Sequence, residues 1–176
     1  MAVLAIARMG HPVLLQVAGD VADPTAPEIR RLIADMRETL DQSGGVGLAA
    51  PQVYVSARLF LYSVPESRSE GADDPALPVQ VLINPRIEPA DDEMLLRMEG
   101  CLSIPGLRGQ VPRYRKIRYR GQDENGDIVQ GVATGFRAHV MQHEMDHLDG
   151  ILYPLRMTDL GRLGFDAEMM RYGARA

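Results

Sequence analysis

Residues 143–147 read His-Glu-Met-Asp-His, a pattern in which two histidines stand four positions apart. On a helix, side chains at this spacing lie one turn apart on one face, so His143 and His147 can bind one metal ion. Glu144 lies beside that face, where its carboxylate can take a proton from a metal-bound water and pass it on. The pattern predicts a hydrolytic metal site. A pair of surface histidines on an amphipathic helix is the alternative, which so short a motif leaves open.

A tetrahedral catalytic site needs a third protein ligand and one open position. Cys101 is one candidate, because Gly100 and Pro105 bracket a stretch that we expect to be rigid and extended and to bring a thiolate to the helix. Burial as a small hydrophobic residue is the ordinary fate of a free cysteine. Glu168 is the rival ligand, because some H-E-x-x-H proteases use a Glu from a following helix. The short chain after Glu168 leaves little room for the second lobe of such a protease, so we favour Cys101.

Two further histidines are weaker candidates. His139 falls on the same helix face as His143 and His147, but three histidines in line on a straight helix cannot all bind one metal ion. We expect His139 to line a pocket or to be hydrogen-bonded. His11 stands in an N-terminal loop and belongs to no motif.

Composition limits the class of protein. A chain of 176 residues is expected to form a single domain over residues 1–176, and a net charge of -5 argues against a nucleic-acid partner, including specific DNA. With one cysteine there is no internal disulfide, and with Lys116 as the sole lysine a Schiff-base mechanism has almost no candidate. Neither a membrane-spanning run nor a signal peptide is visible, so we expect a cytoplasmic protein without membrane contact.

The hydrophobic spacing predicts the elements that position these residues. A helix running from an N-cap at Thr134 to Gly150 would carry the H-E-x-x-H motif. A short C-terminal helix capped by Thr158 or Asp159 would follow it. The other expected elements are an amphipathic helix over 28–42, strands over 58–64 and 79–83 on either side of an exposed loop, and a hairpin of strands 111–120 and 127–133 around Asn125-Gly126.

Three segments resemble, in order and spacing, the signature motifs of peptide deformylases. They are Gly45–Gln52 (G-x-G-x-A-A-x-Q), Glu99–Pro105 (E-G-C-x-S) and Gln142–His147 (Q-H-E-x-D-H), and the likeness runs from about Gly10 to Asp159. The resemblance implies an α+β fold in which antiparallel β-sheets pack around a central helix carrying the H-E-x-x-H motif. It also implies removal of the formyl group from the N-terminal formylmethionine of newly made proteins, with release of formate. The Leu-Ser-Ile-Pro-Gly wording of the second motif is closer to bacterial than to organellar members, so we expect a bacterial source.

The resemblance also implies a role for each motif residue. Cys101, His143 and His147 would hold the metal ion, and Glu144 would be the general acid and base. Gln52 and the backbone N–H of Leu102 would stabilise the oxyanion. The metal implied is Fe2+ in the cell, often replaced by Zn2+ or Ni2+ on isolation, and Co2+ also suits this set of ligands.

The substrate pocket should be apolar and lie next to the metal. Core packing explains the apolar side chains of this region nearly as well as substrate binding does, because every amphipathic helix has a stripe of apolar residues along one face. The residues expected to contact the substrate are Gly45, Val46, Gly47, Gly100, Phe136 and Val140. Two places depart from the family pattern. Tyr54 stands where a glycine is usual, which affects the turn into the next strand, and Arg97-Met98 precedes the second motif where Trp or Glu is common, which affects the rim of the substrate pocket.

The run from Arg113 to Arg120 is the one basic patch. A solvated strand face is the ordinary explanation, and docking on the ribosome near the nascent-chain exit is the functional one. Two other functions remain as alternatives to the deformylase. They are an endoprotease with Glu168 as the third ligand, and a non-enzymatic protein with a structural metal, for which the sequence offers no fourth ligand beside the motifs.

Overall fold

The computed structural model describes residues 2–173 and has an α+β fold, which confirms the expected fold class. Its helices are α1 (Pro27–Ser43), α2 (Gly135–Leu148) and α3 (Asp166–Tyr172). Its strands are β1 (Gly47–Ala49), β2 (Leu59–Val64), β3 (Leu77–Pro89), β4 (Met94–Cys101), β5 (Ile104–Tyr114), β6 (Lys116–Gln122), β7 (Ile128–Thr134) and β8 (Gly164–Phe165). Short 3-10 helices lie between them, among them η2 (Ala50–Val53) and η3 (Glu66–Arg68). No helix within residues 2–173 is both long and apolar enough to cross a membrane.

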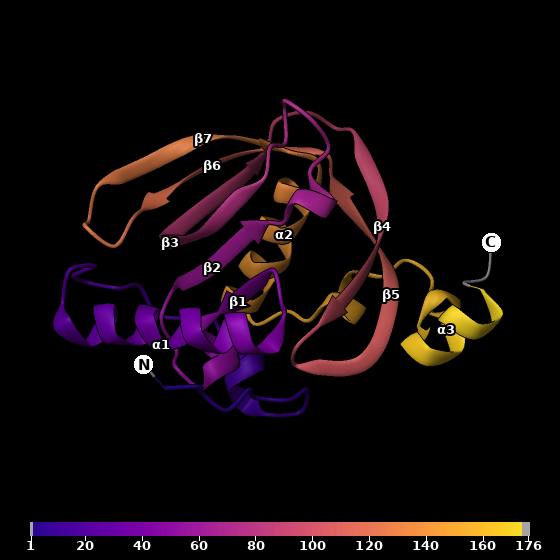
Figure 1. The fold of residues 1–176 in the computed structure, drawn as a ribbon, viewed down its shortest axis with the longest axis horizontal. Helices are drawn as coiled ribbons and strands as arrows, with labels where there is room; N and C mark the ends of the chain where they lie inside the picture. Colours follow the sequence, from indigo (N-terminus) through magenta and orange to yellow (C-terminus); the bar gives the residue numbers. More distant parts are fainter. Residues whose placement is uncertain (1, 174–176) are drawn as a thin grey trace.

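A five-stranded antiparallel sheet, in the order β1-β2-β3-β6-β7, separates α1 from α2. Strand β2 is buried on both faces, since Leu59 and Leu61 pack toward α1 while Phe60 and Tyr62 pack toward α2. A strand made almost entirely of apolar residues is typical of a sheet covered on both faces. In Figure 1, α2 accordingly runs through the middle of the molecule behind β1 and β2.

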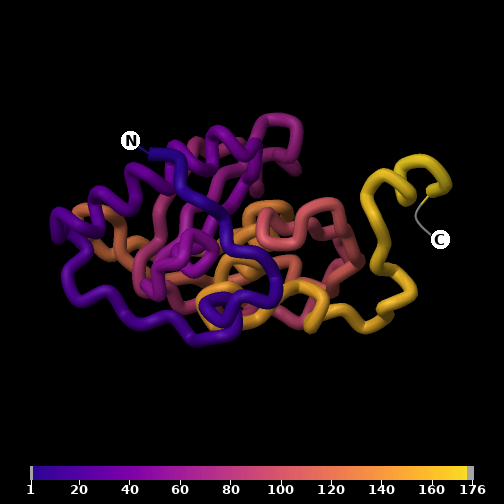
Figure 2. Tube along the Cα trace, turned by 90° about the horizontal axis from the view of Figure 1, so that it is seen from below, coloured from indigo at the N-terminus to yellow at the C-terminus, as the bar shows by residue number. Residues whose placement is uncertain are grey.

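A second sheet closes the other side of α2. Its three strands lie in the order β4-β5-β8, and β4 and β5 form a long antiparallel hairpin. Strand β8 and helix α3 attach to the outer part of β5, and both Figure 1 and Figure 2 show the C-terminal segment at one end of the molecule. The central helix is thus enclosed by two sheets, as the family resemblance implied.

The expected hairpin is half correct. Strand β7 and the turn at Gly126 lie as predicted, but residues 111–120 do not form one strand. The chain bends at Arg115, whose N–H donates to the Glu93 carbonyl and whose carbonyl accepts from the Gly135 N–H. These two bonds hold the bend at the junction of the two sheets. The residues before Arg115 pair with β4 in the small sheet, and those after it pair with β7 in the large one.

The start of α2 also differs from its prediction. Thr134 occupies the N-cap position, but its hydroxyl donates to the Asp73 carbonyl and does not cap the helix. The cap comes from the loop between β2 and β3, where the Asp74 carboxylate accepts from the N–H groups of Phe136 at 2.6 Å and Arg137 at 3.3 Å. This carboxylate is buried, whereas most of the loop is exposed as predicted, so the loop is docked on the helix N-terminus through Asp74.

The predicted tail helix is misplaced. Asp159 caps only the 3-10 turn Leu160–Arg162, and the α-helix begins later, at Asp166. Gly164 lies between them in β8, where it pairs with Arg108 of β5. Strand pairing therefore interrupts the tail before a helix can form.

Candidate metal centre

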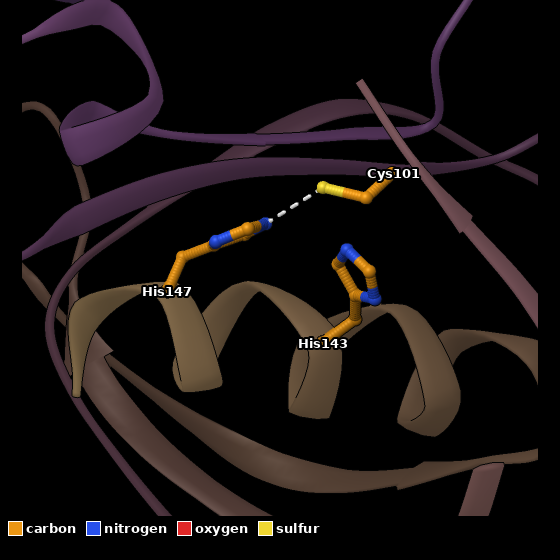
Figure 3. Close-up of side chains that lie close together, drawn as sticks. All are labelled: Cys101, His143 and His147. Atoms are coloured by element: carbon orange, nitrogen blue, oxygen red, sulfur yellow. Dashed lines mark hydrogen bonds between the residues drawn. The ribbon is translucent and has the colours of Figure 1, made fainter. Parts of the chain in front are cut away.

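Three ligand atoms from two elements meet beside α2. Cys101 ends β4, and His143 and His147 lie one turn apart on α2, as Figure 3 shows. The donor atoms of these three residues lie within 4.8 Å of one another, and Cys101 Sγ is 3.2 Å from His147 Nε2. Both histidines are buried against the sheet, so the cluster is a side-chain arrangement of the interior and not a surface pair.

The segment that presents Cys101 is a tight turn and not the rigid extended stretch that we expected. Strand β4 ends at Cys101, which pairs directly with Ile104 at the start of β5. Leu102 and Ser103 form the turn between them, and the Ser103 N–H lies 3.4 Å from Cys101 Sγ. The hairpin thereby directs the thiol sideways toward α2.

Gln52 is held beside this turn. Its side-chain oxygen accepts from the Ala49 N–H at 2.8 Å, which fixes the direction of the amide. The Nε2 group then donates to Ser103 Oγ at 3.1 Å and lies 3.5 Å from Cys101 Sγ. A short 3-10 helix, η2, thus places an amide donor next to the ligand cluster, although nothing in the local sequence distinguishes Gln52 from an ordinary loop residue.

Glu144 faces the same space from α2. Its side chain is buried, one carboxylate oxygen has no hydrogen-bond partner within residues 2–173, and burial raises its pKa to about 7. The carboxyl packs against the backbone of β1, where a Cβ on Gly47 would collide with it. Glycine at position 47 is therefore required by the carboxylate of Glu144. A carboxyl with a pKa near neutrality can both take and return a proton.

A buried chain of charges connects the two ligand-bearing segments. His143 Nδ1 lies 2.7 Å from the Glu99 carboxylate, and both oxygens of Glu99 accept from Arg113 at 2.7 and 3.0 Å. Arg113 Nη1 also donates to Asp146 at 2.6 Å, and Asp146 in turn accepts from Arg156. Burial alone raises the pKa of Glu99, but hydrogen bonds from His143 and Arg113 outweigh it and hold that pKa well below its usual range. One arginine therefore ties the Cys101 strand to the histidine helix.

Sequence reasoning missed this network and misassigned Arg113. The basic run up to Arg120 predicts a solvated face that includes Arg113, but only 5% of the surface of Arg113 is exposed. The available signal was the pair of acids inside the motifs, Glu99 and Asp146, because carboxylates next to buried ligands need a cation to compensate them.

A cavity of about 410 Å³ opens onto the cluster. Cys101, His143, Glu144, Gln52 and Leu102 line it. All six residues expected to contact the substrate also line it, namely Gly45, Val46, Gly47, Gly100, Phe136 and Val140.

The remaining candidates are placed as follows. His139 lines the cavity with Nε2 3.4 Å from Glu99, which matches its expected role as a pocket-lining histidine. Glu168 lies on α3 and borders a different cavity, and the ligand cluster does not include it. His11 is exposed and contacts the ring of Tyr54, with 4.9 Å between ring centroids. Tyr54 has a positive φ of 65°, which explains why a glycine is usual there.

Residues 97 and 98, the second place where the sequence departs from the family pattern, lie at the rim of the cavity. Met98 lines the cavity, and Arg97 makes an ion pair of 2.5 Å with Glu70. This pair fastens the loop between β2 and β3 to β4, so the departure at residues 97–98 shapes the edge of the cavity without disturbing the ligand cluster.

Comparison with known proteins places this site in a family. The family model described as polypeptide deformylase matches residues 3–163. Peptide deformylase 1 of Bordetella pertussis is 52% identical over 161 residues, covering 92% of this chain and 91% of the relative. Peptide deformylase 2 of Ralstonia nicotianae is 49% identical over 160 residues, covering 91% of this chain and 90% of the relative.

Solved structures give the same result. A class I type b peptide deformylase from Acinetobacter baumannii, bound to Met-Ala-Ser, has a TM-score of 0.81 and 38% identity over 89% of this chain and 99% of its own. Peptide deformylase from Thermotoga maritima has a TM-score of 0.81 and 33% identity over 90% of this chain and 100% of its own. The chain therefore belongs to the polypeptide deformylase family, and it is a hydrolase that removes the N-formyl group from nascent peptides.

Proposed function

We propose that residues 1–176 form one catalytic domain in which Cys101, His143 and His147 hold a divalent metal ion. The donor set fits, because a thiolate and two imidazoles whose ligand atoms lie within 4.8 Å suit Fe2+, Zn2+, Ni2+ and Co2+. No fourth protein donor belongs to this group within the described chain, which leaves a position open and argues for a catalytic over a structural metal. When bound, the metal ion would supply Lewis acidity and lower the pKa of a water molecule.

Glu144 acts as the general base and then as the general acid. Its buried carboxyl faces the ligand cluster with one oxygen unpartnered within residues 2–173, which suits it to accept a proton from the attacking water and to deliver it to the amine that leaves the formyl carbon. The Nε2 group of Gln52 and the backbone N–H of Leu102 stabilise the negative charge that develops on the formyl oxygen. The hydrogen bond from Ala49 N–H to Gln52 Oε1 supports this assignment. It holds the side-chain amide so that Nε2, and not Oε1, faces the position of the formyl oxygen.

The substrate is a peptide that begins with formylmethionine. Val46, Phe136 and Val140 supply an apolar wall beside the ligand cluster that suits the methionine side chain. The backbone at Gly45, Gly47 and Gly100 lines the same cavity and can approach an extended peptide closely. The Acinetobacter baumannii relative bound to Met-Ala-Ser, a tripeptide that begins with methionine, supports this placement.

The observation that carries the proposal is that the three donor atoms lie within 4.8 Å of one another, beside a cavity that Cys101 and His143 line. The experiment compares Cys101→Ser with Glu168→Gln. We expect Cys101→Ser to lose metal content and formate release from formyl-Met-Ala-Ser together, whereas Glu168→Gln retains both. Loss of catalysis only in Glu168→Gln would instead favour the endoprotease and contradict the proposal.

We further propose that Fe2+ is the working metal. An electron-rich thiolate beside iron with an open position is a target for oxidation by oxygen. Air should therefore inactivate iron-loaded protein faster than nickel-loaded protein. Mass spectrometry of the peptide that contains Cys101 should then show the added mass of oxygen. Equal survival of the two forms would contradict iron as the working metal.

The proposed place of action is the cytoplasm, on chains emerging from the ribosome. Arg113 takes no part in docking because it is buried, but Arg115, Lys116, Arg118 and Arg120 of the basic run are exposed. Cosedimentation with ribosomes at low and high salt tests this proposal, with Arg118→Ala/Arg120→Ala as the variant. Equal cosedimentation of the variant would remove these residues from the interface.

A further inference from the structure

The acidic and arginine side chains that line the active-site cavity lie at two levels. Glu99 and Glu144 are buried beside the ligand cluster. Arg68, Arg108 and Asp166 also line the cavity, but each is at least partly exposed, so they form the rim of its opening. A peptide whose formyl group reaches the cluster must pass this rim with the residues that follow its methionine.

Arg68 is held over the wall of the methionine pocket. Its guanidinium carbon lies 5.5 Å from the centroid of the Phe136 ring, a cation-π contact. The loop that carries Arg68 is fixed on both sides of the pocket, since Glu70 pairs with Arg97 of β4 and Asp74 caps α2. Arg68 is therefore a positive charge at a defined position, even though its side chain is exposed.

The second arginine of the rim differs in its electrostatic state. Arg108 Nε donates to Asp166 Oδ1 at 2.7 Å, with side-chain exposures of 44% and 31%. Asp166 is the first residue of α3, so the C-terminal segment places a carboxylate against this arginine. Arg68 makes no ion pair within residues 2–173. The rim thus carries one compensated arginine and one uncompensated arginine.

We propose that Arg68 makes this enzyme prefer formylmethionyl peptides with Asp or Glu in the two positions after the methionine, and that Asp166 limits the preference by neutralising Arg108. The proposal rests on the placement of the methionine side chain against Phe136 argued above. Consecutive Cα atoms are about 3.8 Å apart, so the side chains of the next two residues fall within reach of a guanidinium stacked on that ring. An exposed charge pair of this kind changes an equilibrium by about 1.5- to 5-fold.

The first experiment measures kcat/KM of the metal-loaded enzyme for formyl-Met-Asp-Ser and formyl-Met-Lys-Ser. The readout is the Asp-to-Lys ratio within each protein, so that a general loss of activity cancels. We expect a wild-type ratio of about 3 to 5, a ratio near 1 for Arg68→Gln, and a ratio raised about threefold for Asp166→Asn, which frees Arg108. Arg30→Gln, an exposed arginine of α1 that does not line the cavity, is the control and leaves the ratio unchanged.

Ionic strength provides an independent check, because salt screens exposed charges. The wild-type ratio should fall toward 1 when the salt concentration rises from about 0.05 M to about 0.5 M. A wild-type ratio near 1 at low salt, or a ratio unaffected by Arg68→Gln, would overturn the proposal. A fall of the ratio in Asp166→Asn would also overturn it, because Arg108 would then not act on the peptide.

Failure of this inference can be told apart from failure of the proposed function. If the catalytic assignment is wrong, Cys101→Ser retains its metal and its formate release. Calorimetric binding of Met-Asp-Ser and Met-Lys-Ser then still tests the charge preference. Tighter binding of Met-Asp-Ser that Arg68→Gln abolishes supports the role of Arg68, and equal binding of both tripeptides refutes it.

Discussion

His139 links the stability of this enzyme to pH. The side chain is buried between the ring of Phe136 and the Glu99 carboxylate, and Nδ1 has no hydrogen-bond partner within residues 2–173. Burial lowers the pKa of His139 from 6.5 to about 4; Glu99 opposes this shift, while the positive charges of Arg113, His143 and Arg97 add to it. Folded protein therefore holds His139 neutral at a pH where the unfolded chain is protonated.

The sign and size of the effect follow from this difference. Above about pH 6.5 the imidazole is neutral in both states, and the pKa shift does not affect the free energy of unfolding. As the pH falls, the unfolded state binds a proton first, so stability is lost. A difference of about 2.5 units corresponds to about 3 kcal/mol once the pH is below about 4, of which about 2 kcal/mol is lost between about pH 7 and pH 5.

The assay is urea unfolding of metal-loaded protein at about pH 7 and pH 5, for the wild type and His139→Gln. We expect the wild type to lose about 2 kcal/mol more than the variant over this interval, because glutamine does not titrate. His11→Gln, which replaces an exposed histidine outside the cavity, is the control for removal of an imidazole. Equal losses in the wild type and His139→Gln would refute the reasoning, since His139 would then be protonated in the folded state without cost.

Four substitutions test other features of the structure. Glu144→Gln should retain the metal, since Glu144 is not a ligand, and lower kcat by about 100- to 10,000-fold in formate-release assays. Gly47→Ala should displace the Glu144 carboxylate and lower kcat by about 100-fold with unchanged circular dichroism; full activity would show that the carboxyl can move aside. Asp74→Ala removes the cap of α2 and should cost about 1 to 2 kcal/mol in urea unfolding, whereas Asp74→Asn costs less. Tyr54→Gly relieves a left-handed backbone and should stabilise the fold by about 1 kcal/mol, unless the contact with His11 outweighs that gain, which a lower melting temperature would reveal.

Regular hydrophobic spacing made most of the elements predictable. Helix α1, strand β2 and the turn at Gly126 lie within a residue or two of their expected places, because each is determined by its own side chains. The break at Arg115 could not be predicted, since the residues on either side of it are equally strand-forming and the bend depends on Glu93 and Gly135 from distant parts of the chain. Strand β4 escaped notice for a similar reason, because its residues pair with β5 through a turn of only two residues.

The candidate site was predictable to the extent that its chemistry is encoded in short motifs. Spacing on a helix placed His143 and His147 together, the need for a third ligand favoured Cys101, and the resemblance singled out Gln52. Charge compensation was not predictable, because Arg113 has the same local sequence character as the exposed arginines that follow it. Only the three-dimensional contact of Arg113 with both Glu99 and Asp146 distinguishes a buried structural cation from a surface one.

The N-terminus of α2 has a consequence for the order in which the protein folds. Thr134 provides no side-chain cap, and Gly135 enters the helix from a positive φ of 57°, so the local sequence does little to nucleate a helix there. The acceptor for the first N–H groups is Asp74, 62 residues before Phe136. Closing so long a loop is a slow, non-local step. Docking of the chain between β2 and β3 therefore helps to stabilise the helix that spaces His143 and His147, and we expect metal binding to come late in folding.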